Sequence, residues 1–363
     1  MKLVFLVHSL RKGGAERLVL ELASNINCSS ITIISWLDNN EFLEEKYQNV
    51  KVVSLIEKNE YRWLLSLFSS SRKLKSYLNL IAPDNVIIFS HSVFWLAYLA
   101  NYKTKYAYSV QGFSQLSESR GYKKYIYRFI DIITLRRLKS AIVVPTQELY
   151  NEAKKYFVAN NNQLEIIPNG VDVFAIKPKS LKRDEIVITM LGTLSIHKGH
   201  HLTIDIIKKL KKKVSNIKLN IIGEGSIKDE LASKIDENNL DRNIFLLGRR
   251  DDAFNLMNES DIFLHLSLSE GMPLAVIEAM MCSLPIVAFD VSGLRDVVGN
   301  NGFLCDYGDT DSIATRVYEL ISDKNLRDLM SVRSREIALN SFSKQKMILS
   351  YDAYLQRLIE SSN

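Results

Sequence analysis

The sequence predicts an α/β protein with two doubly wound domains, each formed around a parallel sheet. Short apolar runs alternate along the chain with segments of helical periodicity, which is the pattern of successive strand–helix–strand units. The clearest unit has buried strands at residues 261–266 and 285–289, separated by a polar loop and a helix. A length of 363 residues suggests about two such domains.

The predicted first domain begins with a buried strand at residues 2–8, a loop containing Gly13 and Gly14, and a helix at 15–25. The loop lacks the Gly-x-Gly-x-x-Gly pattern, so the sequence argues against a dinucleotide-dependent oxidoreductase. Strands are expected next at residues 30–36, 50–55, 85–89, 105–110 and 141–145. Helices are expected at residues 41–47, 61–80, 92–101 and 146–157.

A cluster of turn residues indicates where the first domain ends. A strand and a Pro-Asn-Gly turn at residues 164–172 precede a polar, Lys-rich segment at 177–185, which is interpreted as the interdomain linker. The second domain then alternates again, with a final amphipathic helix near the C-terminus. Its first strands are expected at residues 186–191, 218–225 and 243–249, and a helix is expected directly after Gly199, to about residue 214.

The composition is typical of an ordinary globular protein, with 47% apolar and 24% charged residues. The net charge is +6, but no block of five like charges occurs, which argues against a nucleic-acid partner. Cys28, Cys282 and Cys305 share no Cys-x-x-Cys spacing, so we expect reduced thiols in a cytoplasmic protein rather than a zinc site. The first apolar run ends at Val7, too short for a signal peptide, and no longer run predicts a membrane span.

Two acids flank the loop that follows residue 266. Glu270 lies in the loop, and Glu278 lies eight positions later, in a helix that we expect to begin at Pro273. Gly271 and the first helical amides would offer N–H groups to an anion, reinforced by the helix dipole. Such a pair is also compatible with a solvated helix face, but the flanking buried strands favour a binding site at the carboxyl edge of the sheet.

The Glu-x7-Glu pair, which brackets Gly-x-Pro, resembles the signature of the retaining glycosyltransferases of the GT4 family. Further landmarks match in order: GGAER at 13–17, IIPNGVD at 166–172, GTLSIHKG at 192–199 and GEG at 223–225. The resemblance implies the GT-B fold, in which two Rossmann-like domains face a cleft and a C-terminal helix crosses back to the first domain. Residues 1–175 would form the acceptor-side domain, 176–340 the nucleotide-sugar domain and 341–363 the returning helix.

The resemblance also implies roles for individual residues. The first glutamate of the family contacts the donor sugar and the second holds the ribose hydroxyls, which assigns these roles to Glu270 and Glu278. Lys198 matches the lysine that meets the donor diphosphate, a task suited to a compact cation. Glu270 and Lys198 are therefore the catalytic candidates. The candidate donor-binding residues are Gly13, Gly14, Thr193, Lys198, Arg249, Glu270, Gly271, Met272, Pro273, Leu274 and Glu278.

Thr193 departs from the family pattern because it occupies the place of an arginine. One of the two usual phosphate cations is therefore missing. Lys12, Arg17 or Arg249 is left to supply the second positive charge.

Gln111 and Gly112 depart from the family's His-Gly turn. An amide cannot titrate near pH 7, so a histidine acid–base role is excluded at this position. His91, Gln111 and Gly112 are the candidates for contacts with the sugar or the acceptor. For His91, a purely structural role is the alternative.

Residues 117–139 form a second candidate binding surface. A basic amphipathic helix bordered by Tyr and Phe can lie on an anionic membrane, whereas a helix packed against the sheet is the alternative. Its apolar residues at helical spacing are Ile126, Phe129, Ile130, Ile133 and Leu138. Its cations are Lys123, Lys124, Arg128, Arg136, Arg137 and Lys139. The acids of Asp309-Thr310-Asp311, by contrast, are expected to cap a helix rather than bind a metal.

Together these features predict a retaining glycosyltransferase that moves a hexose or N-acetylhexosamine from a nucleotide-sugar, expected to be a UDP-sugar, to a saccharide acceptor. We expect a lipid-linked acceptor in bacterial surface polysaccharide synthesis, on the inner face of the membrane. No cofactor or metal is expected, because cations and helix dipoles can meet the charge of the leaving group. The alternatives are an inverting GT-B enzyme, a nucleotide-sugar epimerase and a non-catalytic nucleotide- or saccharide-binding protein.

Overall fold

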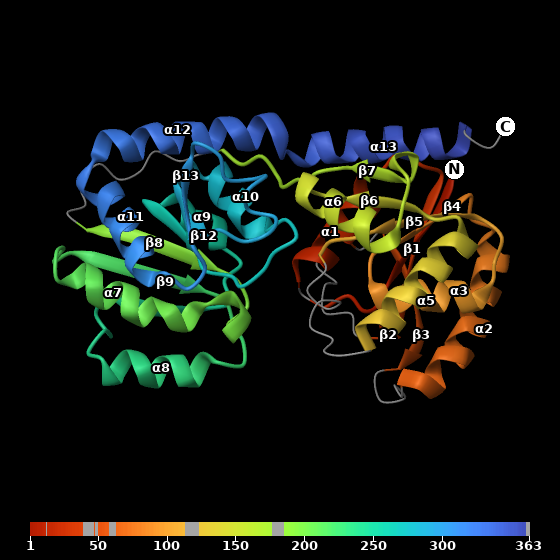
Figure 1. Cartoon of the computed structure of the whole chain (residues 1–363), viewed down its shortest axis with the longest axis horizontal. Coiled ribbons are helices and arrows are strands. Elements are labelled where there is room, and N and C mark those ends of the chain that lie inside the picture. The colour runs from red at the N-terminus through yellow and green to blue at the C-terminus, as the bar shows by residue number, and fades with distance from the viewer. Residues whose placement is uncertain are drawn as a thin grey trace. The chain divides into compact units, whose positions relative to one another are not determined.

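The computed structural model contains two α/β units, each with its own parallel sheet (Figure 1). One unit comprises residues 1–169 and 345–363, and the other comprises residues 170–344. The helix expected at 41–47 and the linker expected at 177–185 lie almost entirely outside the part of the chain that the structure describes. That part consists of residues 1–11, 13–38, 47, 50–57, 63–112, 123–175 and 185–360.

The first unit is built on a seven-stranded sheet in the order β3-β2-β1-β4-β5-β6-β7, with parallel pairing throughout. The strand order reverses beside β1, so β1 and β4 form the switch point at which ligands of such sheets bind. The strands are β1 (Lys2–Val7), β2 (Ser30–Asp38), β3 (Lys51–Glu57), β4 (Asn85–Ile88), β5 (Lys105–Ser109), β6 (Ala141–Val144) and β7 (Leu164–Ile166).

Helices cover both faces of this sheet because side chains along each strand alternate between the faces. Val4 and Leu6 share a core with α2, α3, α5 and α6, whereas Leu3 and Phe5 share one with α1 and α13. The C-terminal helix therefore packs on the first unit, which confirms the expected crossing. These helices are α1 (Gly14–Asn25), α2 (Trp63–Ile81), α3 (His91–Ala100), α5 (Lys123–Leu138), α6 (Gln147–Phe157) and α13 (Lys344–Glu360).

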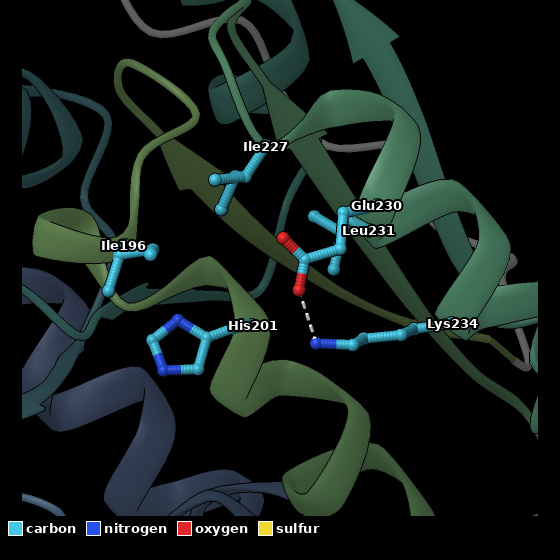
Figure 2. Close-up of a pocket in the computed structure, with 6 residues that line it drawn as sticks. All are labelled: Ile196, His201, Ile227, Glu230, Leu231 and Lys234. Atoms are coloured by element: carbon cyan, nitrogen blue, oxygen red, sulfur yellow. Dashed lines mark hydrogen bonds and ion pairs between the residues drawn. The ribbon is translucent and has the colours of Figure 1, made fainter.

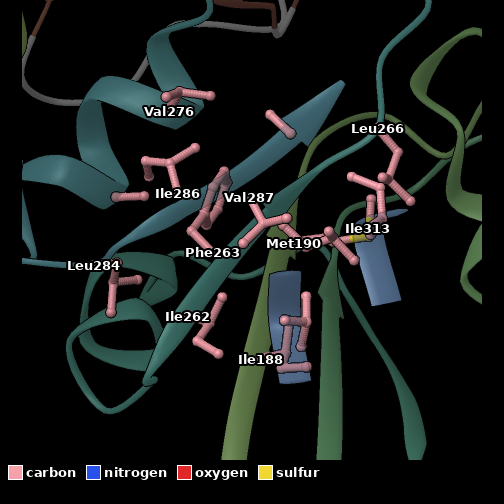
Figure 3. Close-up of a cluster of buried hydrophobic side chains, with 14 of the residues drawn as sticks. Ile188, Met190, Ile262, Phe263, Leu266, Val276, Leu284, Ile286, Val287 and Ile313 are labelled. Carbon is pink, nitrogen blue, oxygen red and sulfur yellow. The ribbon is translucent and has the colours of Figure 1, made fainter. Parts of the chain in front are cut away.

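The second unit has a six-stranded parallel sheet in the order β10-β9-β8-β11-β12-β13. Its core is apolar where β8, β11 and β12 meet α10, as Figure 3 shows for Met190, Phe263 and Val276. The strands are β8 (Ile186–Leu191), β9 (Ile217–Ile222), β10 (Ile244–Gly248), β11 (Ile262–His265), β12 (Ile286–Phe289) and β13 (Gly302–Cys305). The helices are α7 (Thr203–Lys211), α8 (Lys228–Glu237), α9 (Ala253–Asn258), α10 (Leu274–Met281), α11 (Thr310–Ser322) and α12 (Lys324–Ser341).

Two helix starts differ from expectation. Pro273 is the N-cap of α10 rather than its first helical residue, because its ψ of 112° is extended. The helix expected directly after Gly199 begins only at Thr203, because Gly199 has a left-handed φ of +70° between two short 3-10 turns, η4 (Ile196–Lys198) and η5 (His200–Leu202). The expected cap of α11 is confirmed, since the Asp309 carboxylate accepts a hydrogen bond from the Ser312 amide at 2.9 Å.

Within the part of the chain that the structure describes, no helix combines the length and apolar character needed to span a bilayer.

Candidate functional site

Glu270 is the centre of a charged cluster at the carboxyl end of β11. The Lys198 ammonium lies 2.5 Å from Glu270 Oε1, and His265 Nε2 lies 3.0 Å from the same oxygen. The Glu270 side chain is only 11% exposed, and that of Lys198 is 29% exposed. The structure therefore brings together the two predicted catalytic candidates, which are separated by 72 positions in the sequence.

The cluster keeps Glu270 ionised. Burial alone would raise the pKa of its carboxyl, but the hydrogen bond and charge of His265 and the Lys198 ammonium outweigh burial and hold this pKa well below its usual range. Both contacts use Oε1, and Oε2 has no hydrogen bond or ion pair within the described residues. Because Oε2 is also not a buried unpaired atom, the cluster presents one carboxylate oxygen to solvent.

Contacts between two loops place Lys198 beside Glu270. The Leu268 amide donates to the His197 carbonyl at 2.8 Å, and the His197 ring lies 3.2 Å from the Ser269 carbonyl. A Cβ at Gly199 would lie 2.1 Å from the Leu266 carbonyl oxygen, so only glycine permits this approach. The glycine of the Lys-Gly pair thus serves the packing of the site.

The loop between Glu270 and α10 is closed on its other side by Gly293. A Cβ at Gly293 would lie 2.2 Å from the Gly271 carbonyl oxygen, and Gly293 has a φ of +83°. Met272 is 6% exposed and anchors the loop in the core, ahead of Pro273 and Leu274. The first amides of α10 have no acceptor within the helix, as at any helix N-terminus, and can meet an anion.

Glu278 lies on α10 and is 8% exposed. It is the only acid on this otherwise apolar helix. Its burial argues against the solvated helix face that the sequence left open. A role for Glu278 toward a ribose stays a prediction.

The remaining donor-side candidates lie on neighbouring loops at the same edge of the sheet. Thr193 is exposed after β8, and Arg249 is exposed after β10. A Cβ at Gly223, after the intervening strand β9, would lie 1.9 Å from the Gly192 carbonyl oxygen, so these loops pack closely. Arg249 forms no ion pair or hydrogen bond within the described residues.

At the N-terminus of α1, the glycine loop is occupied by a side chain of its own helix. Gly13 is the N-cap, Gly14 is the first helical residue, and the Glu16 carboxylate folds back so closely that a Cβ at Gly13 would meet Glu16 Oε2 at 2.4 Å. Burial raises the pKa of Glu16, against the opposing effects of its own backbone amide and of Arg11. Lys12 lies outside the described residues.

His91 belongs to a second polar cluster, in the first unit. Its Nε2 lies 2.8 Å from the carboxylate of Asp131, a fully buried residue of α5. The same carboxylate accepts hydrogen bonds from Trp95 Nε1 at 2.6 Å and the Tyr156 hydroxyl at 2.7 Å. Asp131 was not singled out in the sequence analysis, although it is the only acid in an otherwise basic helix.

Gln111 is held by structural contacts at both ends of its amide. Its Nε2 donates to Ser109 Oγ at 2.8 Å, and its Oε1 accepts from Asn169 of the Pro-Asn-Gly turn at 2.9 Å. The following Gly112 is exposed. These bonds favour a role for Gln111 in linking β5 to the turn that ends the first unit.

A small pocket of about 140 Å³ lies beside η4 (Figure 2). A Lys234–Glu230 ion pair of 2.5 Å crosses its wall, and neither Glu270 nor Lys198 lines it. Its lining residues are Ile196, His201, Ile227, Glu230, Leu231 and Lys234. The charged cluster, rather than this pocket, is therefore the candidate site.

Comparison with known proteins identifies matches to both halves of the chain. The family model described as "Glycosyl transferases group 1" matches residues 172–337, and that described as "Glycosyltransferase Family 4" matches residues 12–173. Together these models span all the landmarks of the sequence.

Two curated relatives illustrate the match. The UDP-Gal:alpha-D-GlcNAc-diphosphoundecaprenol alpha-1,3-galactosyltransferase of Escherichia coli is 28% identical over 66% of this chain, and the chain spans 66% of that enzyme. The N-acetylgalactosamine-N,N'-diacetylbacillosaminyl-diphospho-undecaprenol 4-alpha-N-acetylgalactosaminyltransferase of Campylobacter jejuni is 25% identical over 98% of this chain and 99% of its own length.

Among solved structures, Anabaena HepE in complex with UDP superimposes with a TM-score of 0.83 at 20% identity, over 98% of this chain and 100% of that chain. At this identity the likeness shows the fold alone. The GT-B fold predicted from the sequence is confirmed.

Proposed function

The chain belongs to the group 1 family of glycosyltransferases, and from this premise we propose that it transfers a hexose or N-acetylhexosamine from a UDP-sugar to a lipid-linked saccharide. The observation that carries the proposal is Glu270, whose carboxylate is fixed through one oxygen and open at the other. An ionised carboxylate held in this way can accept hydrogen bonds from sugar hydroxyls and orient the donor.

The positive charges around Glu270 suit a diphosphate leaving group. Lys198 lies beside Glu270, and the N-terminus of α10 adds backbone amides and the positive end of a helix dipole. Charge that develops on the leaving diphosphate would meet these groups, so the proposal requires no metal ion. Arg249 has no partner among the described residues. It would supply the second cation, which is missing at position 193 because a threonine stands where the family has an arginine.

We assign retention of the anomeric configuration to attack from the face that the leaving group occupies. The bond from the anomeric carbon to the diphosphate oxygen breaks, and the bond to the acceptor hydroxyl oxygen forms. The acceptor proton passes to the departing diphosphate, so no side-chain base is required. This mechanism fits the cluster, in which contacts with Lys198 and His265 hold Glu270 in the ionised form.

The substrate assignments come from relatives. The Escherichia coli relative is named for UDP-Gal and a diphosphoundecaprenol acceptor, the Campylobacter relative is named for a diphospho-undecaprenol acceptor, and HepE binds UDP. We therefore propose a UDP-sugar donor and a polyprenyl-diphosphate-linked acceptor. Such an acceptor places the enzyme peripherally at the inner face of the membrane.

The test begins with thermal-shift binding of UDP-, GDP-, ADP- and dTDP-sugars, with and without chelator. A chelator-resistant shift with UDP-sugars, followed by sugar transfer to a lipid-linked acceptor, is the expected result. Glu270→Gln should lower turnover by on the order of 10²–10³, because the amide removes the fixed anion. Glu319→Gln, which breaks a Glu–Arg pair on α11 (Arg316 Nη1–Glu319 Oε2, 2.8 Å), is the matched control and should retain activity.

Near-normal transfer by Glu270→Gln would contradict the assignment. Binding of a UDP-sugar without turnover under any acceptor would favour the non-catalytic alternative instead. Loss of donor without any acceptor would favour the epimerase.

A further inference from the structure

The outward face of α5 carries apolar side chains where a helix of a globular protein normally carries polar ones. Tyr125 is 72% exposed, Phe129 64%, Ile126 49% and Ile133 38%. At about 100° per residue these four positions fall within one arc of about 100°. The opposite side of the helix packs into the core through Leu135 and Leu138.

The same side of the helix is positively charged at its C-terminal end. Arg136 and Arg137 are exposed there, and the Arg137 guanidinium lies 5.6 Å from the centroid of the Tyr98 ring on the neighbouring helix α3 (Figure 1). The only acid of α5 is Asp131, which is fully buried. The exposed face therefore combines aromatic, aliphatic and cationic groups without a negative charge.

Hydrogen bonds on the inner side fix this orientation. Asp131 accepts bonds from His91, Trp95 and Tyr156, as described above. Arg128 donates to the carbonyls of Tyr156 at 2.9 Å and Lys155 at 2.8 Å. Turning the apolar face inward would break these five bonds, so the helix is held with that face outward.

The charge of the whole chain is concentrated in the unit that contains α5. The first unit, residues 1–169 and 345–363, contains 24 basic residues (Lys and Arg) and 16 acidic residues (Asp and Glu), a net charge of +8. The second unit, residues 170–344, contains 23 basic and 25 acidic residues, a net charge of −2. A charge of this sign attracts an anionic surface and repels a second copy of the same unit.

We propose that the outward face of α5 docks the first unit on a bilayer that contains anionic lipid. Tyr125, Ile126, Phe129 and Ile133 enter the boundary between headgroups and acyl chains, and Arg136 and Arg137 contact lipid phosphates. The inference rests on the proposed function, since it supplies the surface on which a lipid-linked acceptor is presented. Residues 117–122 of the helix expected from the sequence lie outside the described residues.

The test is co-flotation of the full chain with phosphatidylcholine vesicles and with mixed phosphatidylcholine–phosphatidylglycerol vesicles. We expect binding to the mixed vesicles only, weakened by salt because exposed charges are screened. Each cation near the membrane surface contributes about fivefold to binding. The double variant Arg136→Gln with Arg137→Gln should therefore lower the partition coefficient onto the mixed vesicles by on the order of tenfold or more. Tyr125→Ser with Phe129→Ser should abolish detectable flotation.

The matched controls lie in the other unit. Lys208→Gln with Lys211→Gln removes two exposed cations of α7, and Leu329→Ser with Val332→Ser removes two exposed apolar side chains of α12. Both should float as the unmodified chain does. Thermal unfolding of every variant establishes that it is folded before flotation is interpreted.

Equal binding to both vesicle types, or flotation of the α5 variants at the level of the controls, would overturn the proposal. So would a dimer in sedimentation that only the α5 variants dissociate, since the face would then belong to a second copy. An assay of sugar transfer to a water-soluble acceptor, without lipid, distinguishes failure of this inference from failure of the proposed function. The α5 variants should retain that activity, whereas Glu270→Gln should lose it with flotation intact.

Discussion

At the scale of single residues, Glu270 shows how a largely buried carboxylate is kept both charged and correctly placed. Lys198 and His265 contact one oxygen from two directions, so rotation of the carboxylate would break both bonds. An unpaired buried charge is costly, which makes the two partners interdependent with Glu270. Of these partners, Lys198 was predicted from the sequence, whereas His265 was regarded only as part of a strand.

His265 is expected to act as a positioning residue for Glu270. It is 5% exposed at the end of β11, so His265→Leu fits an apolar position but removes the N–H donor. We expect a fall in kcat of roughly 10- to 100-fold, with the affinity for UDP unchanged, because UDP lacks the sugar that Glu270 is proposed to contact. Steady-state kinetics and UDP titration measure the two quantities.

The conservative variant decides whether positioning is the cause. His265→Gln keeps a donor at a similar reach and should recover most of the lost kcat. Equal damage by both variants, or a parallel loss of UDP affinity, would instead indicate a general structural role for His265.

His200 is expected to make the stability of the chain sensitive to mild acid. Burial, followed by the charge of neighbouring His265, lowers the pKa of His200 to about 4. In the unfolded chain this histidine has a pKa near 6.5. Between about pH 4 and pH 6.5 the unfolded chain therefore binds more protons than the folded chain. The stability that neutral His200 contributes is present above about pH 6.5 and is lost as the pH falls toward 4, by on the order of 3 kcal/mol.

Denaturant unfolding at pH 7 and at pH 4.5 measures this effect. His200→Leu, at a site that is 1% exposed, should lose less stability between the two pH values than the unmodified chain. His197→Gln serves as the histidine control and should follow the unmodified chain. An identical pH dependence in all three would show that another group is responsible.

At the scale of elements, the strands could be predicted because parallel strands covered on both faces are continuous apolar runs. The runs at residues 85–89, 141–145 and 285–289 correspond to β4, β6 and β12 within one residue at each end. The helix starts were less predictable, because they depend on single backbone angles such as the left-handed φ of Gly199. Its value follows from the close approach of the Leu266 carbonyl, a contact between distant parts of the chain.

The candidate site could be predicted only in part for the same reason. Glu270 and Lys198 each lie in a recognisable loop, but nothing local in the sequence shows that they touch across 72 positions. Asp131 and His91 are separated by 40 positions and come from different helices. The position of Asp131 as the only acid in a basic helix was a usable signal. An acid on the side of such a helix that faces the protein core needs buried hydrogen-bond donors.

At the scale of the whole molecule, the chain leaves the first unit at the Pro-Asn-Gly turn and returns to it with α13. The crossing is tight, because a Cβ at Gly170 would lie 2.6 Å from the Ser343 carbonyl oxygen. Two backbone hydrogen bonds join the two segments there. The Val171 amide donates to the Phe342 carbonyl at 3.0 Å, and the Val171 carbonyl accepts from the Lys344 amide at 2.8 Å. The helix that follows completes the core of the first unit, although it is encoded after the whole of the second.

This arrangement predicts that a change in α13 destabilises the first unit selectively. Tyr351 is fully buried in the core with Leu3, Phe5 and Leu18, and its hydroxyl lies 3.4 Å from Ser109 Oγ. Tyr351→Ala should therefore cost about 3–5 kcal/mol. Leu349→Ala on the same helix, at a position that is 60% exposed, should stay within about 0.5 kcal/mol of the unmodified chain.

Tryptophan fluorescence makes the selectivity measurable, because all three tryptophans, Trp36, Trp63 and Trp95, lie in the first unit. For Tyr351→Ala the fluorescence midpoint in denaturant should fall, while a part of the helical circular dichroism signal should unfold at the original midpoint. A common shift of both signals would mean that the two units unfold as one cooperative body. An unchanged fluorescence midpoint would mean that α13 contributes little to the core in which Tyr351 is buried.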